Sequence, residues 1–240
     1  MTEVHLHPEL RGLRSAEFTG GTAVMFDLLR ASTTIVHALG AGARAVHVFG
    51  DVDAARAAAG PLEALLCGER ECVRLPGFDL GNSPAEYTTS AVAGRNLALT
   101  TSNGTHALGA CEAAAEVFVG ALANRTALAE ALRDTAQPLH LVLAGRDRRL
   151  GTCDLLAAGA LVDALELGCG DWRLDDASLA AATLWRTVSS DPATRVELLV
   201  RTAAGRHLTR LGMGSDVALC AELDTHDLVP RRCAPGVLEI

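Results

Sequence analysis

The chain has 240 residues, of which 49% are hydrophobic and only 3% aromatic, so its core must be built mainly from Ala, Val and Leu. All 21 basic residues are Arg, and the net charge of −8 argues against a nucleic-acid partner, which would require a basic face. The sequence has neither an apolar run of the ~18 residues that span a bilayer nor the pattern of a secretory signal. These features predict a cytoplasmic protein with no membrane partner.

Segments typical of strands and helices alternate through the first two thirds of the chain. Short apolar runs predict strands at residues 4–7, 22–26, 45–49, 62–67, 96–101, 117–121 and 139–144. Helices are predicted between them, at residues 31–39, 52–59, 85–92, 105–115, 126–133 and 153–167. Such alternation is typical of an α/β protein whose mostly parallel sheet is covered on both faces.

The pattern changes after a turn cluster at residues 168–171. Two helices are predicted next, then a turn or short helix, and finally two late strands: 179–188, 193–203, 205–214, 217–223 and 237–240. Because no linker rich in Pro or Ser interrupts the chain, we expect residues 1–240 to form a single compact domain. Residues 1–120 and 121–240 are candidates for two related α/β halves, although no sequence repeat is strong enough to establish duplication.

The cysteines and histidines do not suggest a metal centre of their own. The seven Cys residues are scattered and odd in number, without a Cys-x-x-Cys pair, which argues against a disulfide framework or a zinc site. The eight His residues show no metal-ligand spacing on a helix. Most of the cysteines are therefore expected to be small buried hydrophobes.

A loop rich in charged and turn-forming residues, 68–84, follows the fourth predicted strand. It has no helical or strand period and contains three glycines and two prolines, so we expect an ordered loop. Ordered loops on a rigid scaffold are frequent places for chemistry, whereas a solvated polar loop is the simpler alternative. Its candidate functional residues are Glu69, Arg70, Asp79, Asn82 and Ser83.

The first strand-to-helix junction carries Asp27 and Arg30 directly after the strand at 22–26. Strand ends that meet helix starts on a parallel sheet form the usual ligand crevice, and a helix start suits an anion. A carboxylate and an Arg at one junction are what a metal-assisted phosphate site needs. The alternative is a structural ion pair between the two, with Ser32 acting as a helix cap.

Two further junctions are rich in polar groups. Four hydroxyl residues, an amide and a glycine at 100–105 can surround phosphate oxygens with neutral donors, although capping alone would explain one or two of them. The third junction, 144–154, holds three Arg residues, of which Arg146 could grip an acidic group in bidentate fashion. Arg148 and Arg149 fit a solvated loop equally well, and Asp154 is favourable in a first helical turn simply through the helix dipole.

These motifs together resemble the 2-phosphosulfolactate phosphatase family, Mg²⁺-dependent hydrolases of a small phosphorylated sulfonate connected with coenzyme M biosynthesis. The likeness is carried by residues 26–35, 68–71, 76–84 and 100–105, and it continues through Asp154 and through Asp216 in the stretch 212–230. The resemblance implies a three-layer α/β/α structure with a mixed, mainly parallel sheet. The chain departs from the family pattern at Arg148, Gly151 and Cys153, where Gly, Ser and Glu are more usual.

On this resemblance we expect a phosphoric monoester hydrolase. Mg²⁺ would be held by Asp27, Glu69 and Asp79, with Asp154 a weaker candidate. Asp27 and Arg30 would be catalytic, with attack either by water or by Asp27 itself. The substrate would be contacted by Arg70, Asn82, Ser83, Thr101, Ser102, Asn103, Gly104, Thr105 and Arg146.

Two other functions remain open at this point. One is a phosphatase of another small phosphorylated acid, which the Cys153 departure makes credible because a carboxylate is lost there. The other is a non-catalytic protein that binds a phosphorylated or sulfonated metabolite. Either function would keep a small anionic ligand as the partner, and association into a homo-oligomer is compatible with the Ala-rich composition.

Overall fold

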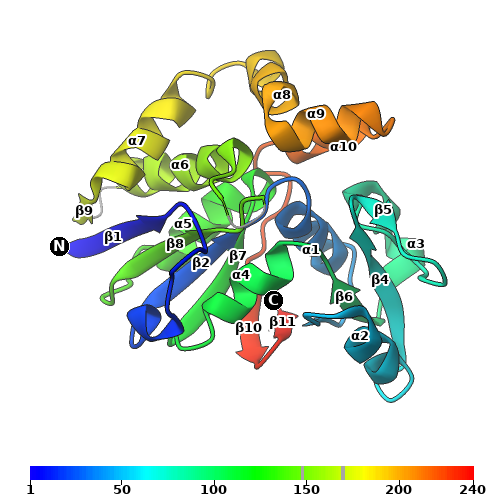
Figure 1. Cartoon of the computed structure of the whole chain (residues 1–240). Coiled ribbons are helices and arrows are strands. Elements are labelled where there is room, and N and C mark those ends of the chain that lie inside the picture. The colour runs from blue at the N-terminus through cyan, green and yellow to red at the C-terminus, as the bar shows by residue number, and fades with distance from the viewer. Residues whose placement is uncertain (147–148, 169–170) are drawn as a thin grey trace.

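The computed structural model describes residues 1–146, 149–168 and 171–240 and consists of a large sheet with helices on both faces (Figure 1). The strands are β1 (Thr2–His7), β2 (Thr22–Phe26), β3 (Ala45–Val48), β4 (Ala64–Arg70), β5 (Val73–Arg74), β6 (Asn96–Thr100), β7 (Glu116–Gly120), β8 (Leu139–Leu143), β9 (Trp172–Leu174), β10 (Arg231–Ala234) and β11 (Val237–Glu239). The helices are α1 (Ala31–Gly40), α2 (Val52–Ala59), α3 (Thr89–Val92), α4 (Gly104–Ala110), α5 (Arg125–Leu132), α6 (Thr152–Leu167), α7 (Asp176–Arg186), α8 (Pro192–Arg201), α9 (Ala203–Arg210) and α10 (Gly214–Cys220).

The sheet contains two parallel groups of strands joined by one antiparallel hairpin. Its order is β5-β4-β6-β3-β11-β10-β7-β2-β8-β1-β9. Strands β4, β6 and β3 pair in parallel, as do β7, β2, β8, β1 and β9. The hairpin of β10 and β11 lies between the groups and is antiparallel to β7 on one side and to β3 on the other. The predicted mixed, mainly parallel sheet is confirmed.

Both faces of the central strands are buried, which makes the fold three-layered. Every residue of β2 is buried, and successive side chains point to opposite faces of a strand. Val24 and Phe26 pack into a large cluster with α5, α6 and α7, whereas Ala23 packs with Phe18 and Cys111 on the opposite face. The predicted α/β/α arrangement is therefore confirmed, and its continuous apolar strands follow from burial on both sides.

Three short helices near the end of the chain pack together above the sheet. Helices α8, α9 and α10 contact one another and lie at the top of Figure 1. Thr202 separates α8 from α9, because its side chain accepts a hydrogen bond from the Gly205 N–H and so caps α9. These helices form the roof over the strand ends on which the candidate site lies.

The structure corrects several of the predicted elements. Residues 217–223, predicted as a strand, belong largely to α10, in which Val217 and Cys220 are buried one helical turn apart. Such a short apolar run does not distinguish a strand from a helix by its period. Residues 85–92, predicted as one helix, form the short helix at Pro84–Glu86 and then α3. The turn predicted at 168–171 includes residues 169 and 170, which lie outside the described residues.

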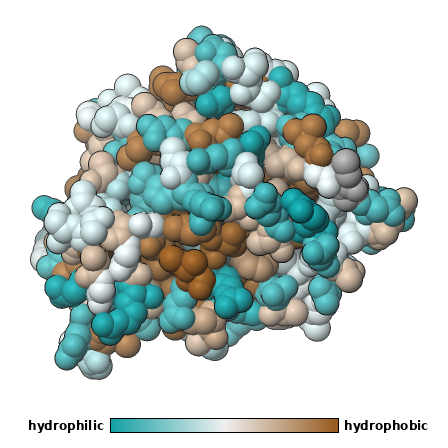
Figure 2. Space-filling model, turned by 180° about the vertical axis from the view of Figure 1, so that it is seen from behind, coloured by the Kyte–Doolittle hydropathy of each residue, from teal (hydrophilic) through white to brown (hydrophobic). Residues whose placement is uncertain are grey.

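The surface away from the viewer of Figure 1 is mixed in character. Figure 2 shows hydrophilic residues over much of this face, with the largest hydrophobic patch near the middle of its lower half. Within residues 1–146, 149–168 and 171–240, none of the helices has both the length and the apolar character needed to cross a membrane.

A cluster of three histidines bridges β1 and β8. His7 Nε2 lies 3.0 Å from His140 Nδ1, and the ring of His5 stacks on that of His140. Burial lowers the pKa of His140 to about 4, with His7 and His5 adding to the effect, and burial likewise lowers the pKa of His7. In the unfolded chain these histidines are therefore protonated below pH ~6.5, whereas in the folded chain they become protonated only at a lower pH.

We expect the folded state to lose stability as the pH falls from about 6.5 to about 4, because protonation is displaced toward the unfolded chain. Replacing His140 by Gln should reduce the fall in Tm over this window by about 3–5 °C. The matched control is His106→Gln at an exposed position of α4. Calorimetry that gives the same acid-dependent fall in Tm for wild type and His140→Gln would contradict the role assigned to this cluster.

Candidate active site

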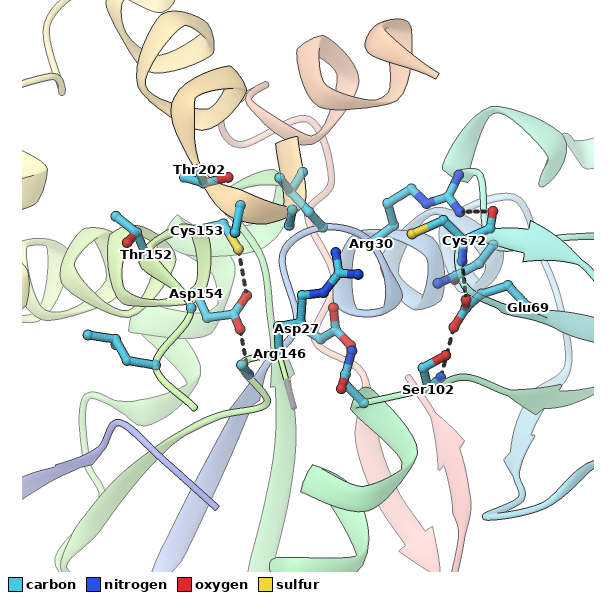
Figure 3. Close-up of a pocket in the computed structure, with 18 of the residues that line it drawn as sticks. Asp27, Arg30, Glu69, Cys72, Ser102, Arg146, Thr152, Cys153, Asp154 and Thr202 are labelled. Carbon is cyan, nitrogen blue, oxygen red and sulfur yellow. Dashed lines mark hydrogen bonds between the residues drawn. The ribbon is translucent and has the colours of Figure 1, made fainter. Parts of the chain in front are cut away.

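The ends of β2, β4, β6 and β8 meet at one cavity of about 210 Å³ (Figure 3). Its roof is the start of α9, and its walls are the loops that follow those strands. Asp27, Glu69 and Asp154 line it together with Arg30 and Arg146. The remaining lining residues are Leu29, Glu71, Cys72, Asn82, Ser102, Asn103, Gly145, Leu150, Gly151, Thr152, Cys153, Thr202, Ala203 and Ala204.

Asp27 is held in the turn between β2 and α1. Its backbone N–H donates to Ser32 Oγ at 2.7 Å, so Ser32 ties the turn to the first turn of α1. The buried carboxylate accepts hydrogen bonds from the backbone N–H groups of Ala31 and Gly104. A Cβ at Gly104 would lie 2.9 Å from Asp27 Oδ2, so glycine permits this close approach of α4 to the carboxylate.

Glu69 is positioned by the hairpin of β4 and β5. Its two carboxylate oxygens accept hydrogen bonds from the backbone N–H groups of Cys72 (2.7 Å) and Ser102 (2.8 Å). The two turn residues, Glu71 and Cys72, have φ values of 52° and 66°, as the central residues of a tight type I′ hairpin do. This backbone geometry turns the Cys72 N–H back toward Glu69.

Asp154 lies in the first turn of α6 and spans two strand ends. Its Oδ1 accepts a hydrogen bond from the Leu28 N–H and its Oδ2 one from the Gly145 N–H, each at 2.8 Å. The Cys153 thiol also points to Oδ1, at 3.4 Å. Burial raises the pKa of Cys153, and the neighbouring carboxylates of Asp154 and Asp27 raise it further, so the side chain remains a neutral thiol.

Burial changes the titration of Asp27 and Asp154, and neighbouring charges add to the effect at Asp27. Burial raises the pKa of Asp27 to about 8, and the charges of Asp154 and Glu69 add to this effect. Burial likewise raises the pKa of Asp154 to about 6, although the N–H donors of Leu28 and Gly145 oppose it. The cavity thus concentrates negative charge that a bound cation would relieve.

Two Arg residues, Arg30 and Arg146, contribute positive charge to the lining of the cavity. Arg30 is buried, and its guanidinium pairs with Asp216 rather than with Asp27. Arg146 pairs with Glu71, and its Nη2 lies 3.7 Å from Glu71 Oε2. The side chain of Arg146 is 40% exposed and that of Glu71 is 82% exposed. Of these two pairs only the first is shielded from water, so the guanidinium of Arg146 is the more available to a ligand.

Asp79 does not join the other three carboxylates. It is exposed and lies outside the cavity lining, and its Oδ2 accepts a hydrogen bond from the Leu66 N–H at 2.8 Å. The side chain therefore pins its loop to β4. Asp79 is predicted as a metal ligand from the family resemblance, with the turn at Pro76–Gly77 expected to bring it to Glu69, but Glu69 lines the cavity and Asp79 does not.

Several of the other residues predicted to contact the substrate form hydrogen bonds with groups of the protein itself. Arg70 donates to its neighbour's carbonyl and to Thr100 Oγ1, and Ser83 Oγ donates to Asp216. At the 100–105 junction only Ser102 and Asn103 line the cavity, whereas Thr101, Gly104 and Thr105 do not. The N–H groups of Ser102 and Gly104 hold Glu69 and Asp27, so these donors serve the protein's own carboxylates.

Three contributors had not been assigned to the site from the sequence. Cys72 and Thr202 line the cavity, and Asp216 pairs with Arg30 from α10. Cys72 falls under the general expectation of small buried hydrophobic cysteines, and only its place in a two-residue hairpin turn could have indicated a role at the site. Asp216 belongs to the motifs that carry the family resemblance, but nothing in its spacing indicates a partner 186 residues away.

The carboxylates surround the cavity without forming a finished metal cage. In the described part of the chain, no group of three or more His, Cys, Asp and Glu side chains is arranged to hold a metal ion. Mg²⁺ needs no such cage, because it keeps several waters and commonly binds through one or two carboxylates plus substrate phosphate. The hard carboxylate oxygens fit such an ion at Asp27, whose pKa is raised by burial and by the charges of its neighbours, with Asp154 or Glu69 beside it.

Comparison with known proteins places the chain in a family. A family model described as 2-phosphosulpholactate phosphatase matches residues 9–234. The chain is 40% identical over 235 residues to a probable 2-phosphosulfolactate phosphatase of Synechococcus sp. (strain RCC307), covering 94% of each chain. A protein of the same description from Deinococcus radiodurans is 41% identical over 211 residues, which cover 87% of this chain and 86% of the relative. The chain therefore belongs to the 2-phosphosulpholactate phosphatase family.

The raised pKa of Asp27, caused by burial and then by the neighbouring carboxylates, leads to a test of stability without metal. Between pH ~4 and ~8 the folded Asp27 retains a proton that the unfolded chain has released, so the stability of the folded state falls as the pH rises. In EDTA at pH 8, Asp27→Asn should raise Tm by about 3–5 °C, and this gain should vanish near pH 4. Asp134→Asn, at an exposed position, serves as control. A destabilised Asp27→Asn variant at pH 8 would contradict the raised pKa assigned to Asp27.

Proposed function

We propose that the chain is a Mg²⁺-dependent phosphatase that hydrolyses 2-phosphosulfolactate to 3-sulfolactate and phosphate. The observation that carries the proposal is a cavity with buried carboxylates and two Arg residues at the strand ends of a chain that belongs to this family. The printed descriptions of the relatives, probable 2-phosphosulfolactate phosphatases, support the same substrate.

The metal would be held by Asp27 together with Asp154 or Glu69, the carboxylates whose charges act on one another. Bound there, Mg²⁺ would supply a Lewis acid for a phosphate oxygen and would lower the pKa of a coordinated water. The backbone N–H groups around each carboxylate fix its direction, so the ligands need little reorganisation when the ion arrives.

The chain's own residues would bind and orient the anionic substrate. Arg30 is the buried cation of the cavity and is suited to the charge that spreads over the phosphoryl oxygens. Arg146 would take the carboxylate or sulfonate end, because substrate can displace the exposed Glu71 from it. The side chains of Asn82 and Ser102, which also line the cavity, add neutral hydrogen-bonding groups.

A phosphatase of a different small phospho-acid is the second candidate, and Cys153 favours it. Its thiol faces the cavity beside Asp154. The family resemblance leads us to expect Glu at this position, so the chain lacks one acidic group at the wall of the site. A neutral wall would alter which acid group the cavity accepts without changing the metal ligands proposed above.

Phosphate release from a panel of substrates tests the proposal. We expect release from 2-phosphosulfolactate with Mg²⁺, loss of release in EDTA, and recovery on adding excess Mg²⁺. The panel should include 2-phospholactate and 2-phosphoglycerate, which lack the sulfonate. Release from these acids but not from 2-phosphosulfolactate would favour the second candidate. Binding of substrate without release under any condition would indicate a non-catalytic protein.

The placement of the carboxylates predicts a contrast between two Asp→Asn variants. Asp27→Asn should lower kcat by at least about 10²-fold, because Asp27 serves the metal or acts as nucleophile on either route. Asp79→Asn should change kcat by less than about threefold, since Asp79 only pins its loop to β4. Steady-state kinetics in which both variants lose activity equally would show that Asp79 belongs to the site after all.

A further inference from the structure

Arg30 and Asp216 form a buried ion pair between the β2–α1 turn and α10. Arg30 Nη1 lies 2.6 Å from Asp216 Oδ2, and the two side chains are only 2% and 6% exposed. Such a pair is held in place tightly, because either charge left alone would be buried without a partner. The contact therefore fixes where the guanidinium can lie.

Further contacts complete the orientation of the guanidinium. Arg30 Nη2 donates to the carbonyl oxygen of Cys72 at 2.8 Å, and Nη1 lies 3.3 Å from Met213 Sδ. Asp216 is itself held, since its Oδ1 accepts a hydrogen bond from Ser83 Oγ at 2.7 Å. The guanidinium is thus held both by α10 and by the β4–β5 hairpin.

Arg30 and Asp216 differ in whether they line the cavity. Arg30 lines it, as Figure 3 shows, whereas Asp216 is absent from its described lining. A carboxylate so placed would act on a substrate in the cavity through Arg30 rather than by direct contact. Because a guanidinium has five N–H donors in a rigid fork, fixing one edge on Asp216 and Cys72 also fixes the direction of the others.

Asp216 also competes with the carboxylates of the site. Asp27 and Glu69 line the same cavity as Arg30, and their charges act on one another. A guanidinium that lost its partner on α10 would be attracted to them, and such a pair would withdraw both the cation from the phosphate and a carboxylate from the metal. Held by Asp216, Arg30 keeps its charge for the ligand.

We propose that Asp216 is the positioning residue that holds Arg30 for the phosphoryl group of the substrate and keeps it from the carboxylates at Asp27 and Glu69. This inference rests on the proposed function, in which Arg30 is the phosphate-binding cation. Asp216 thereby makes α10 and the roof helices part of the catalytic machinery, although α10 contributes no group that contacts the substrate.

The test is a double-mutant cycle with Asp216→Asn, which retains the size of the side chain and removes its charge. We expect kcat/KM to fall about 10- to 100-fold and the Kd of inorganic phosphate, measured by calorimetry with Mg²⁺, to rise about 10-fold. In an Arg30→Gln background the same substitution should change neither quantity further, because Asp216 acts through Arg30. Asp216→Glu, which restores the charge, should recover part of the loss.

Asp224→Asn is the matched control, because Asp224 also pairs with an Arg, Arg125, at 2.8 Å, but outside the cavity. It should leave kcat/KM and phosphate binding unchanged. Equal losses from Asp216→Asn with and without Arg30, or unchanged phosphate affinity in Asp216→Asn, would overturn the positioning role. If Asp216→Asn does not fold, Ser83→Ala replaces it, with an expected rise in phosphate Kd of about threefold; no rise would equally overturn the role.

The two readouts separate this inference from the proposed function. A wild-type chain that binds phosphate but releases none from any substrate contradicts the phosphatase, while the effect of Asp216→Asn on binding still decides the positioning role. An active wild type with an unaffected Asp216→Asn variant contradicts the positioning role alone. A wild type that neither hydrolyses a substrate nor binds phosphate overturns both.

Discussion

Burial of three carboxyl groups around one cavity is the constraint on which the rest of the site depends. Asp27, Glu69 and Asp154 come from three distant parts of the sequence, and each would be costly to bury without donors. Each accepts hydrogen bonds from two backbone N–H groups, and some of these donors belong to other segments, such as Ser102 for Glu69. The site is thus built by the backbone at the strand ends, and the strands must be in register for it to exist.

This arrangement reverses the usual use of helix starts. The first N–H groups of a helix commonly receive a phosphate or another anion from outside. Here the donors at Ala31 and Gly104 receive the carboxylate of Asp27, so this part of the positive backbone potential is taken up within the protein. In the function proposed above, recognition of an anionic ligand would then fall to the guanidinium groups and to a cation held by the carboxylates.

The sequence allowed the fold class to be predicted because hydrophobic runs and helical segments alternate, and that alternation is a local property. Asp27 and Glu69 could be placed together because each lies at the carboxyl end of a strand of a mainly parallel sheet. Asp79 could not be judged in this way, since the path of its loop depends on a tertiary hydrogen bond to Leu66. The same applies to α10, whose short apolar run acquires helical structure where it packs against α8 and α9.

The hairpin of β10 and β11 has a consequence for how the chain is made. It joins the two parallel groups in the middle of the sheet, yet it is translated after every other strand. While the ribosome is still adding the last of these residues, Glu69 and Asp27 belong to groups that share no strand pairing. Because synthesis proceeds at about 5–20 residues per second, each nascent chain spends several seconds after β8 is made with these two groups not yet joined. The cavity that Glu69 and Asp27 line together is therefore complete only once this last hairpin has joined the two groups.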